Sequence, residues 1–233
     1  MNVKTLAAIG IAALLATAPV SAAEIKVLAS NGVRAALEEL APAFVKRQIE
    51  GGEAFDLAIL TGAGIDDLAK QGKVDAASRA EIARSGVGTG IKKGAPRPDI
   101  GTPDAFKRTL LSAKSIAWAK EGHSGIYFAG LLERIGIAGQ IKPKAVLAPS
   151  GAVMGKLIAA GEVQFGVILV NELMAAPGVE VLGPLPAELQ NYTAFHAGVG
   201  GGSKDSSAAK ALIKFLTTPA AGAVFKAKGQ EAG

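Results

Sequence analysis

The amino-acid sequence predicts an α/β protein built from open, mostly parallel sheets with helices on both faces. Short apolar runs typical of strands alternate with segments that have the apolar stripe of a helix. Thirty glycines and eleven prolines mark many turns between these elements, and 49% hydrophobic residues allow a sizeable core. A length of 233 residues fits either one large α/β unit or two lobes.

The predicted elements cover most of the chain. Strands are expected at 25–29, 55–60, 87–92, 115–119, 145–148, 164–170 and 179–182, and an extended segment at 191–199. Helices are expected at 33–45, 65–71, from Thr102-Pro103 onward, 125–134, 151–160, 206–217 and 219–228. The stiff segment 94–98 cannot be helical, and we place the first crossing between lobes there.

The first 23 residues have the three-part pattern of a secretory signal peptide. A short segment with one positive charge, at Lys4, precedes an unbroken apolar stretch over residues 6–16. Residues 20–23 then offer a cleavage site after Ala22 or Ala23. Because the apolar stretch is short for a membrane span, we expect it to be removed. The mature protein is then soluble and lies outside the cytoplasm.

The composition and the motifs exclude several classes of site. The chain has no cysteine, which rules out disulfides and thiolate-bound metals. Its net charge of +5 comes from dispersed residues, without a basic run that could follow a nucleic-acid backbone, so no nucleic-acid partner is expected. The two histidines, His123 and His196, fit no metal-ligand spacing. His123 adjoins Ser124, but no Gly-x-Ser-x-Gly motif is present. We therefore expect no metal, no cofactor and no catalytic residue.

Three strand-to-helix junctions carry small or polar residues at the start of a helix. A helix N-terminus presents unpaired backbone N–H groups and about half a positive charge. Glycine lets a ligand approach that backbone closely, and serine adds a hydroxyl donor. Each junction also fits an ordinary helix cap, but three that face one cleft can bind a tetrahedral or carboxylate anion. The residues expected to bind it are Ser30, Asn31, Gly32, Ser124, Gly125, Ser150 and Gly151.

Several stretches, in this order, are shared with a known family. They are 27–30 through Leu37, 48–52 with 55–57, 124–127, 161–162 with 165–167, and 211–216 with Pro219. In these stretches the chain resembles the molybdate-binding-protein-like group of periplasmic solute-binding proteins. The resemblance implies a type II periplasmic binding protein, with two lobes joined by two crossing strands. The anion is held between the lobes and delivered to the permease of an ABC importer in the inner membrane.

On this basis we assign residues 1–23 to the signal peptide, 24–94 and 192–233 to lobe 1, and 95–191 to lobe 2 of a monomeric periplasmic protein. Ser124 and Gly151 fall on two backbone-amide contacts of the family's site. The family's first serine falls on Gly32, and its tyrosine falls on Leu169. A strand and a second serine loop of the family are missing between Arg47 and Gln48.

The expected ligand is therefore a small molybdate-like oxyanion. Because two side-chain contacts are substituted and one loop is lost, a receptor for a small organic carboxylate is the main alternative. A secreted hydrolase on the same fold and a sensor without a transport role are the others.

Overall fold

The structure is a computed structural model that describes residues 27–29, 55–120 and 122–233. In this part of the chain the strands form one sheet in the order β1-β2-β8-β3-β6-β4-β5, and both β7 and β9 also pair with β3. The strands are β1 (Val27–Ala29), β2 (Leu57–Thr61), β3 (Ala80–Lys92), β4 (Ile116–Ala119), β5 (Ala145–Ala148), β6 (Phe165–Leu169), β7 (Val179–Pro184), β8 (Tyr192–Val199) and β9 (Glu231–Ala232).

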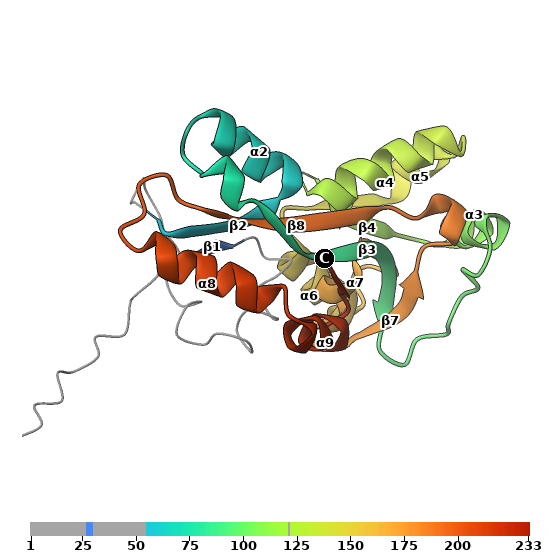
Figure 1. Ribbon diagram of the computed structural model, residues 1–233. Coiled ribbons are helices and arrows are strands. Elements are labelled where there is room, and N and C mark those ends of the chain that lie inside the picture. The colour runs from blue at the N-terminus through green and yellow to red at the C-terminus, as the bar shows by residue number, and fades with distance from the viewer. Residues whose placement is uncertain (1–26, 30–54, 121) are drawn as a thin grey trace, which may run out of the picture.

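Helices cover both faces of the sheet, with α2 and α4 on one side and α8 and α9 on the other (Figure 1). The α-helices are α2 (Gly62–Lys70), α3 (Pro103–Ser112), α4 (His123–Arg134), α5 (Ala138–Ile141), α6 (Gly151–Ala160), α7 (Val170–Met174), α8 (Ser206–Leu216) and α9 (Pro219–Ala227). Short 3-10 turns lie at Ala76–Ser78, Lys142–Lys144 and Ala187–Leu189. The predicted α/β class is confirmed, and the predicted helix at 33–45 lies outside the described residues.

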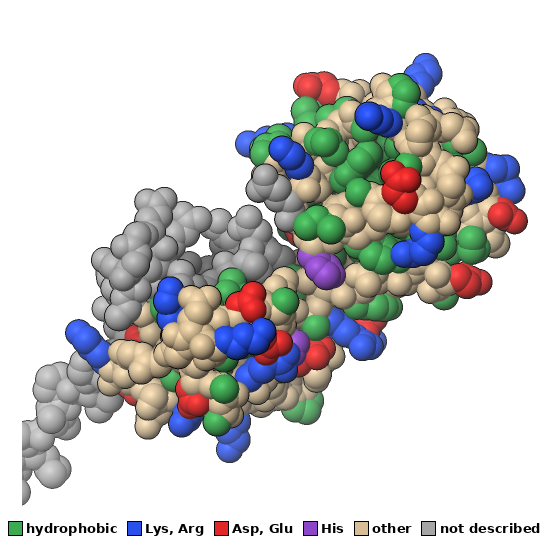
Figure 2. Space-filling model, turned by 90° about the horizontal axis from the view of Figure 1, so that it is seen from above, with side chains coloured by type: hydrophobic (Ala, Val, Ile, Leu, Met, Phe, Trp, Pro, Cys, Tyr) green, Lys and Arg blue, Asp and Glu red, His purple; other side chains and the backbone are tan. Residues whose placement is uncertain are grey.

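The long strand β3 belongs to both halves of the sheet. Residues 80–86 pair with β8, whereas residues 87–92 pair with β6 and β7. The change of partner thus falls between Gly86 and Val87, before the predicted crossing at 94–98. The described residues form two larger masses joined by a narrower part (Figure 2). The lobe boundaries given above remain a prediction.

The core holds the helices against the sheet. The largest cluster of buried side chains includes Phe106, Phe128, Phe165 and Phe225, none of which is exposed to solvent. A second cluster joins side chains of α6 and α7 to β6; it includes Met154, Ile158, Ile168 and Leu173. Because burying such a side chain contributes about 1.5–3 kcal/mol, these contacts hold α6 and α7 against β6.

The parallel direction of three strands brings several helix N-termini to one edge of the sheet. Strand β4 lies between β5 and β6 and is parallel to both, so their carboxyl ends point the same way. Helix α4 follows β4, α6 follows β5, and α7 follows β6. In open α/β sheets this edge is where ligands bind.

Candidate functional site

A pocket of about 300 Å³ lies at the carboxyl ends of these strands. It is lined by the starts of α4 and α6, by the end of β6 with α7, by Thr61 before α2, and by the first part of β8. The lining combines hydroxyl groups and backbone at helix starts with apolar side chains such as Ile168 and Phe195. Such a pocket suits a ligand that has both anionic groups and a carbon skeleton.

The structure places only some of the predicted site residues in this lining. Ser124, Ser150 and Gly151 line the pocket, and Gly125 does not. Leu169, on which the family's tyrosine position falls, also lines it and presents an apolar side chain. Ser30, Asn31, Gly32 and the Arg47-Gln48 junction lie outside the described residues.

The N-terminus of α4 is open toward the pocket. Its N-cap residue is Gly122, and no side chain of the described residues caps the helix. Ser124, in the first turn, is buried and lines the pocket. A side chain at Gly125 would overlap the backbone carbonyl of Ala119, at the end of β4. Gly125 therefore serves the close approach of α4 to β4, and this approach places Ser124 at the pocket.

The N-terminus of α6 carries a different arrangement. The Ser150 hydroxyl caps the helix by accepting a hydrogen bond from the backbone N–H of Val153 at 3.3 Å. At Gly151, an added Cβ would overlap the carboxylate of Glu172 and crowd the side chain of Ile168. The lack of a side chain at Gly151 thus lets the Glu172 carboxyl lie directly against the first turn of α6.

Gly151→Ala is expected to lower the free energy of unfolding by about 1–2 kcal/mol, because Glu172 and Ile168 must move to admit the methyl group. Gly139→Ala is the matched control, since an added Cβ there has nothing within 4 Å. Urea denaturation of both variants measures the difference. Equal stability of the two variants would mean that Glu172 does not lie against α6.

Glu172 is an acidic residue of the described lining that the sequence analysis did not identify. It lies on α7, three residues after the end of β6. It makes no hydrogen bond or ion pair with any residue in the described ranges. Burial raises the pKa of its carboxyl from 4.5 to about 7, so both protonation states are populated near neutral pH. Its one signal in the sequence was an acidic residue soon after a strongly apolar strand.

Thr193 on β8 supplies an unused donor. Its side chain is 3% exposed and lines the pocket, and no described residue forms a hydrogen bond with its Oγ1. A buried hydroxyl left unpaired costs about 1–3 kcal/mol. Such a group is expected to be satisfied by a ligand. The sequence placed this residue in an extended segment and gave it no role in binding.

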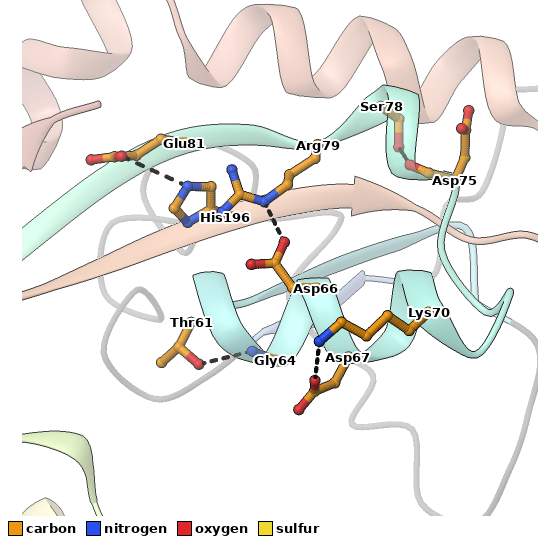
Figure 3. A network of polar contacts seen from close by, with 10 residues as sticks. All are labelled: Thr61, Gly64, Asp66, Asp67, Lys70, Asp75, Ser78, Arg79, Glu81 and His196. Carbon is orange, nitrogen blue, oxygen red and sulfur yellow. Dashed lines mark hydrogen bonds and ion pairs between the residues drawn. The ribbon is translucent and has the colours of Figure 1, made fainter.

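A polar network supports the wall of the pocket at α2 (Figure 3). Thr61 caps α2 by accepting a hydrogen bond from the N–H of Gly64 at 3.3 Å. Arg79 Nε donates to Asp66 of α2 at 2.8 Å, and Arg79 lies between Asp66 and His196. Burial and the nearby Arg79 lower the pKa of His196, so its ring is neutral at pH 7. His196 does not line the pocket, and its network ties α2 to the sheet.

His123 lines the pocket but is not part of a serine–histidine pair. Its Nε2 lies 3.3 Å from Oδ1 of Asn191, which joins the start of α4 to the segment before β8. Within the described ranges it makes no hydrogen bond to Ser124 or to a carboxylate. The described residues also contain no cluster of acidic and histidine side chains that could hold a metal ion.

Residues 45–231 match the family model described as bacterial extracellular solute-binding protein. The chain belongs to this family. The family-level resemblance drawn from the sequence is thereby confirmed. No helix in the described part of this solute-binding protein is long and apolar enough to cross a membrane.

One curated protein and several solved structures are similar to this solute-binding protein, and their names describe different activities. An aconitate isomerase from a Pseudomonas species is 30% identical over 94% of this chain and 93% of its own length. The periplasmic molybdate-binding protein of Azotobacter vinelandii has a TM-score of 0.71 and 18% identity, over 90% of this chain and 100% of that one. The structure of PEB3 bound to L-phospholactate has a TM-score of 0.67 and 15% identity, and the match covers 90% of this chain and 100% of that one. A further Peb3 structure in the comparison is from Campylobacter jejuni. The solved structures confirm the periplasmic-binding-protein fold.

Proposed function

We propose that this solute-binding protein captures a small organic polycarboxylate in the pocket at the starts of α4 and α6. The observation that carries the proposal is the buried side chain of Thr193, which lines the same pocket as the N-terminus of α4. Among the described residues, nothing pairs with the Thr193 hydroxyl and no side chain caps α4. Together they offer hydrogen-bond donors and a partial positive charge to an anion, without a lysine or arginine in the described lining.

An organic anion is favoured over a molybdate-like oxyanion by the rest of the lining. Ile168, Leu169 and Phe195 present apolar surface, which suits carbon atoms and leaves a tetrahedral oxyanion without partners there. A tetrahedral oxyanion would also leave most of the 300 Å³ to water.

A second function, isomerisation of the bound polycarboxylate, is favoured by one observation. Glu172 has a pKa close to neutral pH and lies in the pocket, as a group that moves protons would. The full-length similarity to an aconitate isomerase supports this candidate and makes aconitate the first ligand to try.

Location and delivery are part of the same proposal. Residues 1–23 have the pattern of a signal peptide, and the family is described as extracellular. We therefore place the mature protein in the periplasm as a monomer, where it delivers its ligand to an ABC permease. Co-purification with the permease in detergent, in the presence of the ligand, tests this step.

Isothermal titration calorimetry of the mature protein tests capture directly. The panel is cis-aconitate, trans-aconitate, citrate and succinate against molybdate, tungstate and sulfate. We expect binding of at least one polycarboxylate and weaker binding of the inorganic anions. Binding of molybdate alone would restore the oxyanion proposal, and binding of none would refute capture at this pocket.

Thr193→Val is expected to separate ligand binding from stability. The change removes one hydroxyl that has no partner among the described residues, so stability stays equal or rises. Loss of a hydrogen bond to an anion weakens binding by roughly tenfold or more. Thr217→Val is the control, because the Thr217 hydroxyl bonds the carbonyl of Lys214 at an exposed helix end. If Thr193→Val binds the polycarboxylate as tightly as the wild type, Thr193 is not a contact.

A further inference from the structure

We propose that Glu172 is the catalytic acid–base residue of this pocket and moves a proton between two carbon atoms of a bound unsaturated polycarboxylate. The inference rests on the proposed capture of such an anion, and it assigns a residue to the isomerisation. Two geometric observations carry it: the position of the carboxyl group in the lining, and the absence of any partner for it among the described residues.

The fold holds the Glu172 carboxyl against the ligand space. Helix α7 begins directly after the buried strand β6, and Leu173 of α7 packs in the core cluster beneath α6. Gly151 leaves room for the carboxyl beside the first turn of α6. No described residue forms a hydrogen bond or ion pair with this carboxyl group, and Glu172 is part of the pocket lining.

The surroundings suit a group that both takes and gives a proton. Burial among apolar neighbours brings the pKa to about 7, where acid and base forms coexist. The positive end of α6 beside the carboxyl keeps the charged form accessible. His123 is the other titratable side chain of the described lining, and its Nε2 is already bonded to Asn191.

The proposed step is a proton shift along an allylic unit. The Glu172 carboxylate takes a proton from the saturated carbon next to the double bond. The electron pair of that C–H bond forms the new double bond, and the former π pair moves to the far carbon and its carboxylate. The protonated Glu172 then returns the proton to that far carbon. The composition of the ligand is unchanged, and no oxidant or co-reactant is needed.

The same donors that bind the anion stabilise the charge that develops in this step. The intermediate carries added negative charge on carboxylate oxygens. The open N-terminus of α4, with Ser124 in its first turn, and the hydroxyl of Thr193 present donors and positive potential to them. Because these donors are fixed by the fold, they need little rearrangement as the charge forms.

The experiment follows cis- and trans-aconitate by proton NMR in D₂O with the mature protein, and compares Glu172→Gln with wild type. Glu162→Gln is the matched control, because Glu162 is exposed and lies at the opposite end of α6. Thermal melts and calorimetric titration of each variant report folding and binding separately from turnover.

We expect the wild type to interconvert the isomers and to exchange allylic hydrogen for deuterium. Its kcat/KM should rise with pH and level off above about 7. Glu172→Gln should lower kcat by roughly 10²–10⁴-fold without weakening binding, and should remove the pH-dependent rise. Glu162→Gln should behave as the wild type.

Three outcomes would overturn the inference, and they are distinguishable. Wild-type turnover by Glu172→Gln would show that another group moves the proton. Binding by the wild type without isomerisation or deuterium exchange would refute catalysis and leave capture intact. Binding of neither aconitate isomer, nor of any other polycarboxylate, would refute the proposed function itself.

Discussion

Gly125→Ala is expected to lower the free energy of unfolding by about 3 kcal/mol, near the upper end of what an added methyl group costs in a packed site. An added Cβ would overlap the carbonyl oxygen of Ala119, which is backbone and cannot turn aside as a side chain does. Relief requires α4 to move away from the end of β4. The change should also weaken ligand binding, because Ser124 moves with the helix.

Urea denaturation measured against Gly130→Ala gives the test. Gly130 lies on the exposed face of the same helix, and an added Cβ there meets nothing within 4 Å. Since alanine favours helix over glycine by up to about 1 kcal/mol, this control should be neutral or slightly stabilising. A Gly125→Ala variant as stable as its control would mean that α4 does not approach β4 this closely.

A second large effect is expected in the pH dependence of stability. The pKa of Glu172 is about 7 in the folded protein and near 4.5 when the chain is unfolded. The folded state therefore holds a proton that the unfolded state releases between these values. Stability contributed by Glu172 is fully present below pH 4.5 and is lost as the pH rises to about 7, by at most roughly 3 kcal/mol.

Glu172→Gln isolates this contribution because glutamine does not titrate. The variant should match the wild type near pH 4.5 and exceed its free energy of unfolding above pH 7, by up to roughly 3 kcal/mol. His196 acts in the opposite sense: its lowered pKa removes stability as the pH falls below 6.5. That contribution cancels in the difference between the two proteins. A difference independent of pH would contradict the burial of Glu172.

Local sequence patterns were enough for most of the fold. Helix α6 spans 151–160 as predicted, and Thr102 and Thr218 cap α3 and α9 as their Thr-Pro pairs indicate. Strand β3 was predicted only from Val87, yet it begins at Ala80. Its first half includes the charged residues Glu81 and Arg84, and it becomes a strand because β8 and β9 pair with it. Such pairing depends on distant segments and leaves little local signal.

The candidate site was also predicted only in part from local sequence. Helix starts with serine and glycine can be read locally, and Ser124, Ser150 and Gly151 do line the pocket. Glu172 was missed because the predicted strand 164–170 included Val170, the first residue of the short helix α7, and no helix was predicted there. Thr193 was missed because threonine is common in strands. That its hydroxyl lacks a partner follows only from what surrounds it in three dimensions.

Strand β3 pairs with different strands in its first and second parts, and this arrangement should affect how the protein unfolds. One continuous strand completes the sheet of both halves, and its two ends pair with different neighbours. If either half came apart, β3 would lose its neighbours there and leave the other half with a frayed strand and unpaired backbone groups. The free energy of each half therefore depends on the other. We expect the halves to melt in a single cooperative transition, and neither to persist as an independent fragment.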